Sequence, residues 1–170
     1  HCISSAASDV YKRQGIYIGG DKAAWENVKP ILAMMGCHQI HMGPNGSGLV
    51  MKMLHNVQVA GIQNSVNEML TAAAHYNIPK DAFREAISYG GATNFYLDSK
   101  INSLIAEDYS TAFSMQNMAK DVNIMTSMLK DADLNLPGVK VIKHVYDKGL
   151  ESGLGGEDFC ATFKVVKNNA

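Results

Sequence analysis

The sequence lacks an excess of charge of either sign. It contains 15 basic and 16 acidic residues among 170, which gives a formal net charge of −1 at pH 7. A protein that binds nucleic acid usually presents a basic stripe, and no such stripe occurs along this chain. The charge balance therefore argues against nucleic acid as a partner.

Long apolar runs and paired cysteines are also missing. No stretch reaches the roughly 18 uncharged apolar residues of a membrane-spanning helix, so we expect no membrane partner. Cys2, Cys37 and Cys160 are scattered and form no C-x-x-C pair. An odd, unpaired set fits a reducing compartment better than a disulfide framework, which predicts a cytoplasmic protein. The histidines are scattered as well, and we assign them no metal.

The first 14 residues, HCISSAASDVYKRQ, differ in character from the rest of the chain. They lack an initiator methionine, a consistent period and the apolar core of a signal peptide. They resemble the translated adapter sequence found at the ends of sequence fragments. We expect residues 1–14 to be a non-native segment, and we expect the N-terminal part of the native protein to be missing.

Residues 15–43 predict a strand, a helix and a second strand. The first strand is GIYIGG (residues 15–20), after which Asp21 is a plausible helix N-cap. The helix is expected to run to Gly36, restarted or kinked at Pro30. Its apolar residues recur at helical spacing: Trp25, Val28, Leu32 and Met35. The second strand is CHQIHM (residues 37–42). Such a unit is the edge of an α/β sheet and is too small to stand alone.

The chain after Gly46 predicts helices throughout. Residues 47–76 form the longest, with apolar residues on nearly all faces, so we expect this helix to be buried between other elements. The further predicted helices lie near residues 79–91, 94–105, 110–132 and 137–149 or 137–153. The fourth helix carries its apolar face on Met118, Val122, Met125 and Leu129. A last short helix within residues 155–167 has acidic residues in its first turn.

The glycine-rich stretch GPNGSGLVMK invites two nucleotide-binding interpretations that fail. A P-loop needs lysine directly after its last glycine, whereas Lys52 comes four residues after Gly48. A dinucleotide-binding fingerprint needs G-x-G-x-x-G, whereas this stretch gives G-x-x-G-x-G. What remains is a strand-to-helix junction whose glycines allow a ligand or a backbone to approach the helix N-terminus.

Lys52 and Asn56 are polar residues inside the apolar helix, and their spacing of four places them on one face. In one interpretation Lys52 extends to solvent and Asn56 satisfies a neighbouring backbone group. In the other they form a site, because a desolvated lysine suits general acid/base chemistry and a carboxamide can bind a substrate hydroxyl. Their pattern alone leaves both interpretations open.

Three stretches together resemble the β-hydroxyacid dehydrogenase superfamily, typified by 3-hydroxyisobutyrate dehydrogenase. They are GGDKAAWENVKPILAMMG, HMGPNGSGLVMKMLHN and NMAKDVNIM, and the resemblance covers Gly15–Asn169. It implies a mainly α fold of the 6-phosphogluconate dehydrogenase C-terminal type, built on a long interdomain helix. Residues 15–43 would be the α/β remnant of an NAD(P)-binding Rossmann domain, and residues 44–170 an all-helical catalytic and oligomerisation domain. The resemblance also implies a homo-oligomer, a dimer or a tetramer.

The family motif G-x-G-x-x-x-K-x-x-x-N supplies the candidate site. It maps onto Gly46, Gly48, Lys52 and Asn56. The resemblance implies that Lys52 is the general acid/base and that Asn56, with the two glycines, binds substrate.

Two later motifs also match the family. Its Lys-Asp pair maps to Lys120 and Asp121 and implies that Lys120 reaches the cofactor, NAD or NADP. The segment GLGGEDFCA resembles the family's closing G-x-G-x-x-D, and we interpret its Asp158 as structural, near a helix start.

The chain departs from the family pattern in two places. The nucleotide-binding G-x-G-x-x-G and the substrate-binding S-G-G motif are absent from it. KMLHN also resembles the K-M-x-H-N of 6-phosphogluconate dehydrogenase, but Val59 stands where that relative has an acidic glutamate. We therefore interpret His55 as a packing residue rather than an acid/base group.

The expected function is hydride transfer between NAD(P) and a small β-hydroxyacid, of the 3-hydroxyisobutyrate or 2-hydroxy-3-oxopropionate type. The chain alone would be inactive because it lacks a dinucleotide-binding core. The alternative is a non-catalytic helical oligomerisation module, which the apolar long helix supports equally well. An imine-reducing relative usually replaces the lysine, so Lys52 argues against that third possibility.

Overall fold

The computed structural model describes residues 15–169, so the prediction for residues 1–14 lies outside the described part. The protein is mainly helical, with two parallel strands near its N-terminal end, which confirms the predicted fold class. Its contacts divide it into two compact units, residues 1–55 and 56–170. The division falls inside the long helix α3 (Ser47–His75). The predicted domain boundary between residues 43 and 44 stays a prediction.

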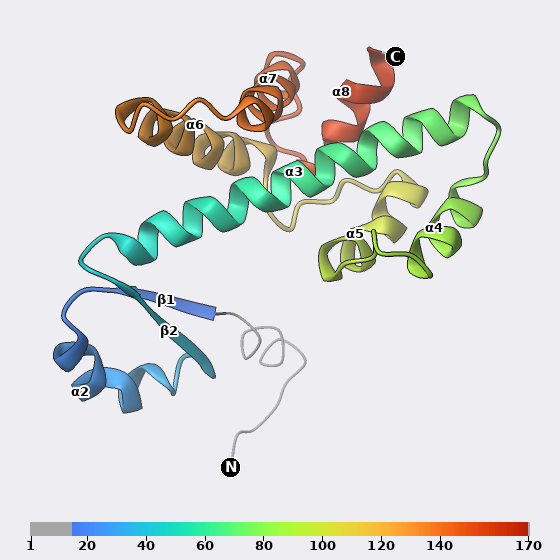
Figure 1. Ribbon diagram of the computed structural model, residues 1–170. Coiled ribbons are helices and arrows are strands. Elements are labelled where there is room, and N and C mark those ends of the chain that lie inside the picture. Colours follow the sequence, from blue (N-terminus) through green and yellow to red (C-terminus); the bar gives the residue numbers. More distant parts are fainter. Residues whose placement is uncertain (1–14, 170) are drawn as a thin grey trace. The chain divides into compact units, whose positions relative to one another are not determined.

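The first unit is a strand–helix–strand arrangement followed by the start of α3 (Figure 1). Strands β1 (Gly15–Gly19) and β2 (His38–Gly43) pair in parallel, with Gly15 opposite His38. Helix α2 (Lys22–Leu32) connects them, as a parallel pair requires. The Asp21 carboxylate accepts a hydrogen bond of 2.7 Å from the Ala24 N–H, which confirms the predicted N-cap.

The end of α2 differs from the prediction. The helix continues through Pro30 without restarting and ends at Leu32, four residues before Gly36. Pro30 has no N–H to donate to the carbonyl four residues back, and its ring crowds that carbonyl, so the helix extends only two residues beyond it. Met35, predicted on the apolar face of this helix, lies in the turn beyond it and is 71% exposed.

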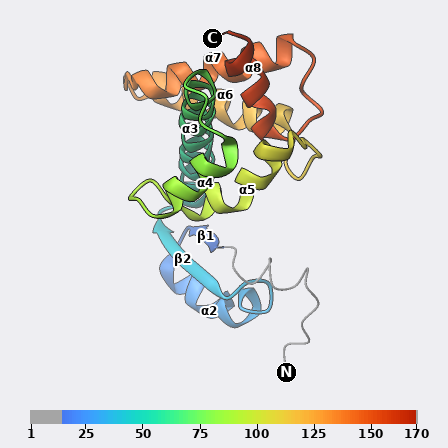
Figure 2. The ribbon, with the colours of Figure 1, turned by 90° about the vertical axis from the view of Figure 1, so that its right-hand side faces the viewer.

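The second unit consists of the rest of α3 and the helices that follow it. These are α4 (Lys80–Ser88), α5 (Phe95–Ala106), α6 (Met115–Asp131), α7 (Pro137–Glu151), the 3₁₀ turn η1 (Phe159–Ala161) and α8 (Thr162–Asn168). Within this unit, α4 and α5 lie on one side of α3, and α6, α7 and α8 lie on the other (Figures 1 and 2). In the described residues, no helix combines the length and the apolarity that crossing a membrane requires.

Helix α3 buries a single stripe against its neighbours in the second unit. The stripe consists of Val57, Ala60, Gln63, Val66, Asn67, Leu70 and Ala73, which follow one another at intervals of three residues apart from the adjacent pair Val66 and Asn67. Met69, between stripe positions, is 51% exposed. As predicted, α3 lies between other helices within the second unit, but Met69 shows that part of its surface stays exposed, because apolar composition does not fix how many neighbours a helix has. The predicted face of α6 is confirmed at Met118, Val122 and Met125, which are buried.

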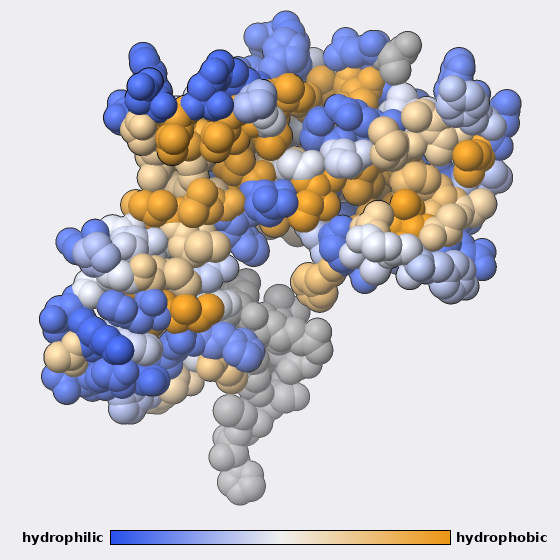
Figure 3. All heavy atoms as spheres, in the orientation of Figure 1, coloured by the Kyte–Doolittle hydropathy of each residue, from blue (hydrophilic) through white to orange (hydrophobic). Residues whose placement is uncertain are grey.

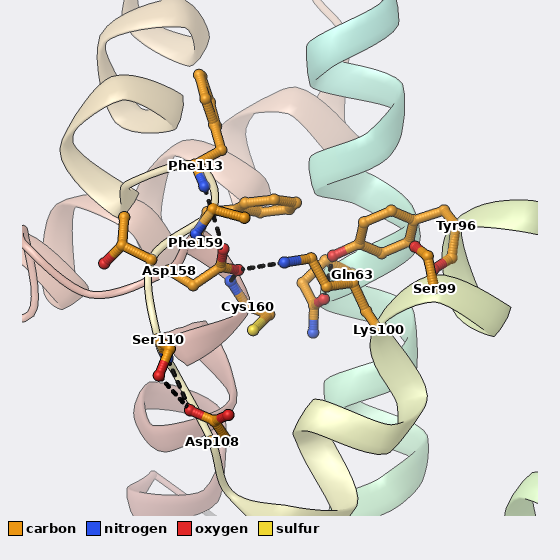
Figure 4. Close-up of polar contacts among 12 residues, drawn as sticks. Gln63, Tyr96, Ser99, Lys100, Asp108, Ser110, Phe113, Asp158, Phe159 and Cys160 are labelled. Carbon is orange, nitrogen blue, oxygen red and sulfur yellow. Dashed lines mark hydrogen bonds and ion pairs between the residues drawn. The ribbon is translucent and has the colours of Figure 1, made fainter. Parts of the chain in front are cut away.

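The last helical segment begins with an acidic cap rather than with acidic residues in its first turn, which corrects the prediction. Asp158 precedes η1 and is 1% exposed. Its carboxylate accepts hydrogen bonds from Lys100 Nζ (2.9 Å) and from backbone N–H groups of Ala112 (3.0 Å), Phe113 (3.2 Å) and Cys160 (3.1 Å) (Figure 4). The prediction that Asp158 is structural and lies near a helix start is confirmed.

The hydrogen bonds around Asp158 also shift the pKa values of Asp158 and Cys160. Burial alone would raise the pKa of Asp158, but the hydrogen bonds from Cys160, Lys100 and Phe113 outweigh it and hold the pKa below its ordinary value. Burial, and then the hydrogen bond with Asp158, raises the pKa of Cys160 to about 12. The Cys160 thiol therefore stays protonated and unreactive at neutral pH.

We expect Asp158→Asn to destabilise the second unit by about 3 kcal/mol, because it leaves the Lys100 ammonium without its buried counter-ion. Urea unfolding followed by far-ultraviolet circular dichroism measures the change. The matched control is Asp147→Asn, which breaks the partly exposed ion pair with Lys143 and should cost less than about 1 kcal/mol.

The same variants should differ in acid. Because the pKa of Asp158 is lowered on folding, its carboxylate stabilises the fold above the unfolded pKa of about 3.9. That contribution is lost as the pH falls through the lower, folded-state pKa. The stability gap between wild type and Asp158→Asn should therefore close in acid. A gap that is absent at pH 7, or that is independent of pH, would contradict this account of the Asp158 cap.

Candidate functional site

Gly46 and Gly48, at the start of α3, have different structural reasons. Gly48 is buried, and a Cβ placed there would lie 2.5 Å from the carbonyl oxygen of Tyr17 on β1. Gly46 is different, because no atom lies near its Cβ position and its φ of +92° alone favours glycine. Both residues were predicted to bind substrate. Packing and backbone conformation explain the two glycines without a substrate, so that role stays a prediction.

Lys52 lies near the start of α3, in the first unit, and is half-buried. Because it follows the helix N-terminus by little more than a turn, the unsatisfied N–H groups of that terminus favour negative charge near it. Its neighbour His55 contacts β1, with its Nδ1 atom 3.5 Å from the hydroxyl of Tyr17 and the two ring centroids 6.3 Å apart. His55 itself is exposed, so this is a surface contact, and the interpretation of His55 as a packing residue stays a prediction.

Asn56 lies one turn after Lys52 on α3, at the start of the second unit, and is half-buried. Its carboxamide Nδ2 donates a hydrogen bond of 2.6 Å to the Asp121 carboxylate on α6. Asp121 is 1% exposed. The structure therefore adds a contact that the sequence analysis did not predict. A signal for it exists in the sequence: Asp121 falls on the apolar face of α6 beside Met118 and Val122, where a carboxylate needs a donor.

Lys120 lies on the exposed side of α6. Its side chain is 60% exposed, and its Nζ atom lies 3.5 Å from Asp121 Oδ1. It lines an open cavity of about 450 Å³, together with Gln116, Asn123, Ile124, Ser127 and Leu150. A solvated lysine beside an acid accounts for these contacts by itself, so the predicted contact of Lys120 with the cofactor stays a prediction.

The predicted site residues are divided between the two units. Gly46, Gly48 and Lys52 belong to the first, and Asn56 and Lys120 to the second. Within the second unit, Asn56 and Lys120 both contact Asp121. Among residues 15–169, no group of three or more histidine, cysteine, aspartate or glutamate side chains could hold a metal ion.

Comparison with known families gives a match over most of the chain. The model of a family described as "NAD-binding of NADP-dependent 3-hydroxyisobutyrate dehydrogenase" matches residues 46–166. This range contains the candidate residues Gly46, Gly48, Lys52, Asn56 and Lys120.

Curated relatives are similar over nearly the whole chain. A 2-(hydroxymethyl)glutarate dehydrogenase of Eubacterium barkeri is 24% identical over 151 residues, which cover 88% of this chain and 50% of that protein. A glyoxylate/succinic semialdehyde reductase of Arabidopsis thaliana is 26% identical, covering 89% of this chain and 53% of that protein. A 2-hydroxy-3-oxopropionate reductase of Escherichia coli is 26% identical, covering 95% and 56%. The chain spans about half the length of these relatives.

Solved structures show the same fold. A 3-hydroxyisobutyrate dehydrogenase from Salmonella typhimurium superposes with a TM-score of 0.80 at 20% identity, over 86% of this chain and 52% of that one. The enzyme of that name from Mycobacterium tuberculosis also gives a TM-score of 0.80 at 20% identity, over 88% and 53%.

We expect Gly48→Ala to destabilise the first unit by about 3 kcal/mol, because the new methyl group would overlap the Tyr17 carbonyl and force backbone apart. Gly46→Ala is the matched control and should cost about 1 kcal/mol, the strain of a positive φ alone. The fluorescence of Trp25, the only tryptophan, reports unfolding of this unit from α2. Equal unfolding midpoints for the two variants would contradict the close approach of β1 to α3.

Proposed function

Because the chain belongs to the family of 3-hydroxyisobutyrate dehydrogenase-like NAD-binding domains, we propose that it is the helical half of an NAD(P)-dependent oxidoreductase. The reaction is hydride transfer between NAD or NADP and a small β-hydroxyacid, of the 3-hydroxyisobutyrate or 2-hydroxy-3-oxopropionate type. One observation carries this proposal. The half-buried Lys52 and Asn56 stand one turn apart on α3, directly after the glycine junction. The names of the relatives support the substrate class, since they act on short hydroxyacids or their aldehydes.

In this proposal Lys52 handles the proton. Its Nζ atom takes the hydroxyl proton of the substrate during oxidation and returns it to the oxygen during reduction. The positive end of α3 and the lysine charge both favour an anion, which suits the alkoxide that develops on that oxygen. Asn56 orients the substrate through its carboxamide, which can both donate and accept hydrogen bonds. Gly46 and Gly48 let the substrate approach the backbone.

The side chains of the second unit fit an anionic cofactor. Lys120 presents an exposed ammonium beside the open cavity of α6, where it can pair with a phosphate or a carboxylate as a point charge. We propose that Lys120 holds NAD(P) there. When bound, NAD(P) supplies or accepts the hydride, while the chain binds, orients and exchanges the proton. Without a dinucleotide-binding core, the chain alone would turn over negligibly.

We also propose a cytoplasmic homo-oligomer, a dimer or a tetramer. The cysteines support the proposed cytoplasmic location, because Cys37 and Cys160 are both free thiols. Exposed apolar side chains in the second unit support self-association, among them Met69, Tyr89 and Phe95. One face of the molecule carries apolar areas among charged residues (Figure 3).

The alternative proposal is a helical module that only oligomerises, which the same exposed apolar side chains would serve. Lys52 and Asn56 distinguish the two, because a helix that only packs would tolerate leucine at both positions. The decisive experiments therefore change single polar side chains and measure turnover and folding together.

We expect Lys52→Met to lower the turnover number about 10²–10⁴-fold in the full-length enzyme, because it removes the general base and keeps the apolar volume. Its unfolding temperature should stay close to that of wild type. The assay uses NAD and NADP with a panel of short β-hydroxyacids. Lys148→Met is the control, because that lysine is exposed and pairs only with Glu151 among the described contacts. Turnover within a few-fold of wild type in Lys52→Met would remove the lysine from catalysis.

Lys120→Ala should raise the Michaelis constant for the cofactor or the substrate while leaving the unfolding temperature nearly unchanged. The reason is that an exposed lysine contributes under about 1 kcal/mol to folding, whereas a phosphate contact contributes directly to binding. Lys130→Ala, at the exposed end of the same helix, is the control. If both Michaelis constants are unchanged in Lys120→Ala, this residue does not contact the ligands.

A further inference from the structure

Asp121 stands on the buried side of α6, where a carboxylate is costly. It is 1% exposed, and the residues that share its side of the helix, Met118, Val122 and Met125, are all apolar and at most 3% exposed. A buried carboxylate is retained only where donors compensate for the lost water. One donor is the Asn56 carboxamide, whose Nδ2 atom lies 2.6 Å from Asp121 Oδ2.

This hydrogen bond fixes which way the carboxamide of Asn56 faces. The terminal amide of an asparagine can rotate by half a turn and exchange its oxygen and nitrogen. An ionised carboxylate accepts hydrogen bonds and cannot donate, so only the NH₂ group of Asn56 can face Asp121. The carbonyl oxygen Oδ1 must then point away from Asp121, together with the second N–H.

The two residues differ in access to solvent. Asp121 is out of reach of a ligand, since 1% of it is exposed, whereas Asn56 is half-buried and keeps an open side. Asp121 is one of the buried residues of α6, among Met118, Val122 and Met125. It can therefore set the orientation of Asn56 without contacting a substrate.

We propose that Asp121 is a positioning residue, which locks the Asn56 carboxamide so that its second N–H donates to the oxygen of the substrate hydroxyl and leaves the hydroxyl proton for Lys52 Nζ. This inference rests on the proposed function. It specifies the ligand class further. The reacting carbon must carry an oxygen that accepts from the Asn56 N–H in both redox states, as the hydroxyl of a hydroxyacid and the carbonyl of its aldehyde both do.

Asp121→Asn in the full-length enzyme tests the kinetic consequence. An amide at position 121 can accept or donate, so the Asn56 carboxamide loses its fixed orientation. We expect kcat/KM for the hydroxyacid to fall about 10–100-fold, the scale of a misplaced substrate-orienting group. Asp131→Asn is the matched control, because it removes the same charge from an exposed position on the same helix.

The double variant Asn56→Asp with Asp121→Asn exchanges the two side chains. It distinguishes a positioning role of Asp121 from a role that only links α3 to α6. The exchange restores an amide–carboxylate hydrogen bond but places the carboxylate on the open side. We expect the unfolding temperature to return toward wild type while kcat/KM stays at or below that of Asp121→Asn. Recovery of activity together with stability would overturn the inference, because the link alone would then suffice.

A third experiment measures hydrogen exchange in the 170-residue chain itself and does not depend on catalysis. In nuclear magnetic resonance spectra, the Asn56 side-chain proton bonded to Asp121 should exchange slowly with solvent, and Asp121→Asn should remove that protection. Unchanged exchange would overturn the positioning role whatever the activity. A wild-type enzyme with protected Asn56 but no hydroxyacid turnover would instead overturn the proposed function, and with it the substrate contacts assigned to Asn56.

Discussion

Polar side chains buried along α3 need partners on other helices, and this requirement ties the second unit together. A buried amide without a hydrogen bond costs about 1–3 kcal/mol, so each one restricts where its neighbour can lie. Asn56 bonds to α6, Gln63 accepts from Tyr96 on α5, and Asn67 donates to Thr162 at the start of α8. Apolar contacts would tolerate small shifts between these helices, whereas hydrogen bonds fix how each helix lies along α3.

Two buried carboxylates in this unit, Asp158 and Asp121, differ in the groups that surround them. Asp158 receives hydrogen bonds from one ammonium and three backbone N–H groups, which leaves it little capacity for another partner. Asp121 receives its hydrogen bond from Asn56, a side chain that still has an open face. Both acids are equally hidden from solvent, so burial alone would not distinguish them.

Local signals in the sequence were sufficient for much of the fold. The Asp21 cap, the glycine turns and the methionine face of α6 all depend on residues within a few positions of one another. The end of α2 differs from the prediction because the helix passes through Pro30 without restarting and stops two residues later. Asn56 and Asp121 are 65 residues apart, and no local pattern joins them. The exposure of Met69 likewise depends on how many helices pack around α3, which its own sequence does not specify.

The polar contacts between α5, α3 and η1 run in one direction. The Tyr96 hydroxyl donates to Gln63, Gln63 to Asn67, Asn67 to Thr162 at 3.0 Å, and Thr162 to the Phe159 carbonyl at 3.0 Å. Each group uses its donor toward the next, so the dipoles align and reinforce one another. Reversing Gln63 would set its oxygen against the oxygen of Asn67, and reversing Asn67 would set its nitrogen against the nitrogen of Gln63. Substitutions along this series are therefore epistatic, and evolution can exchange its members together more readily than one at a time.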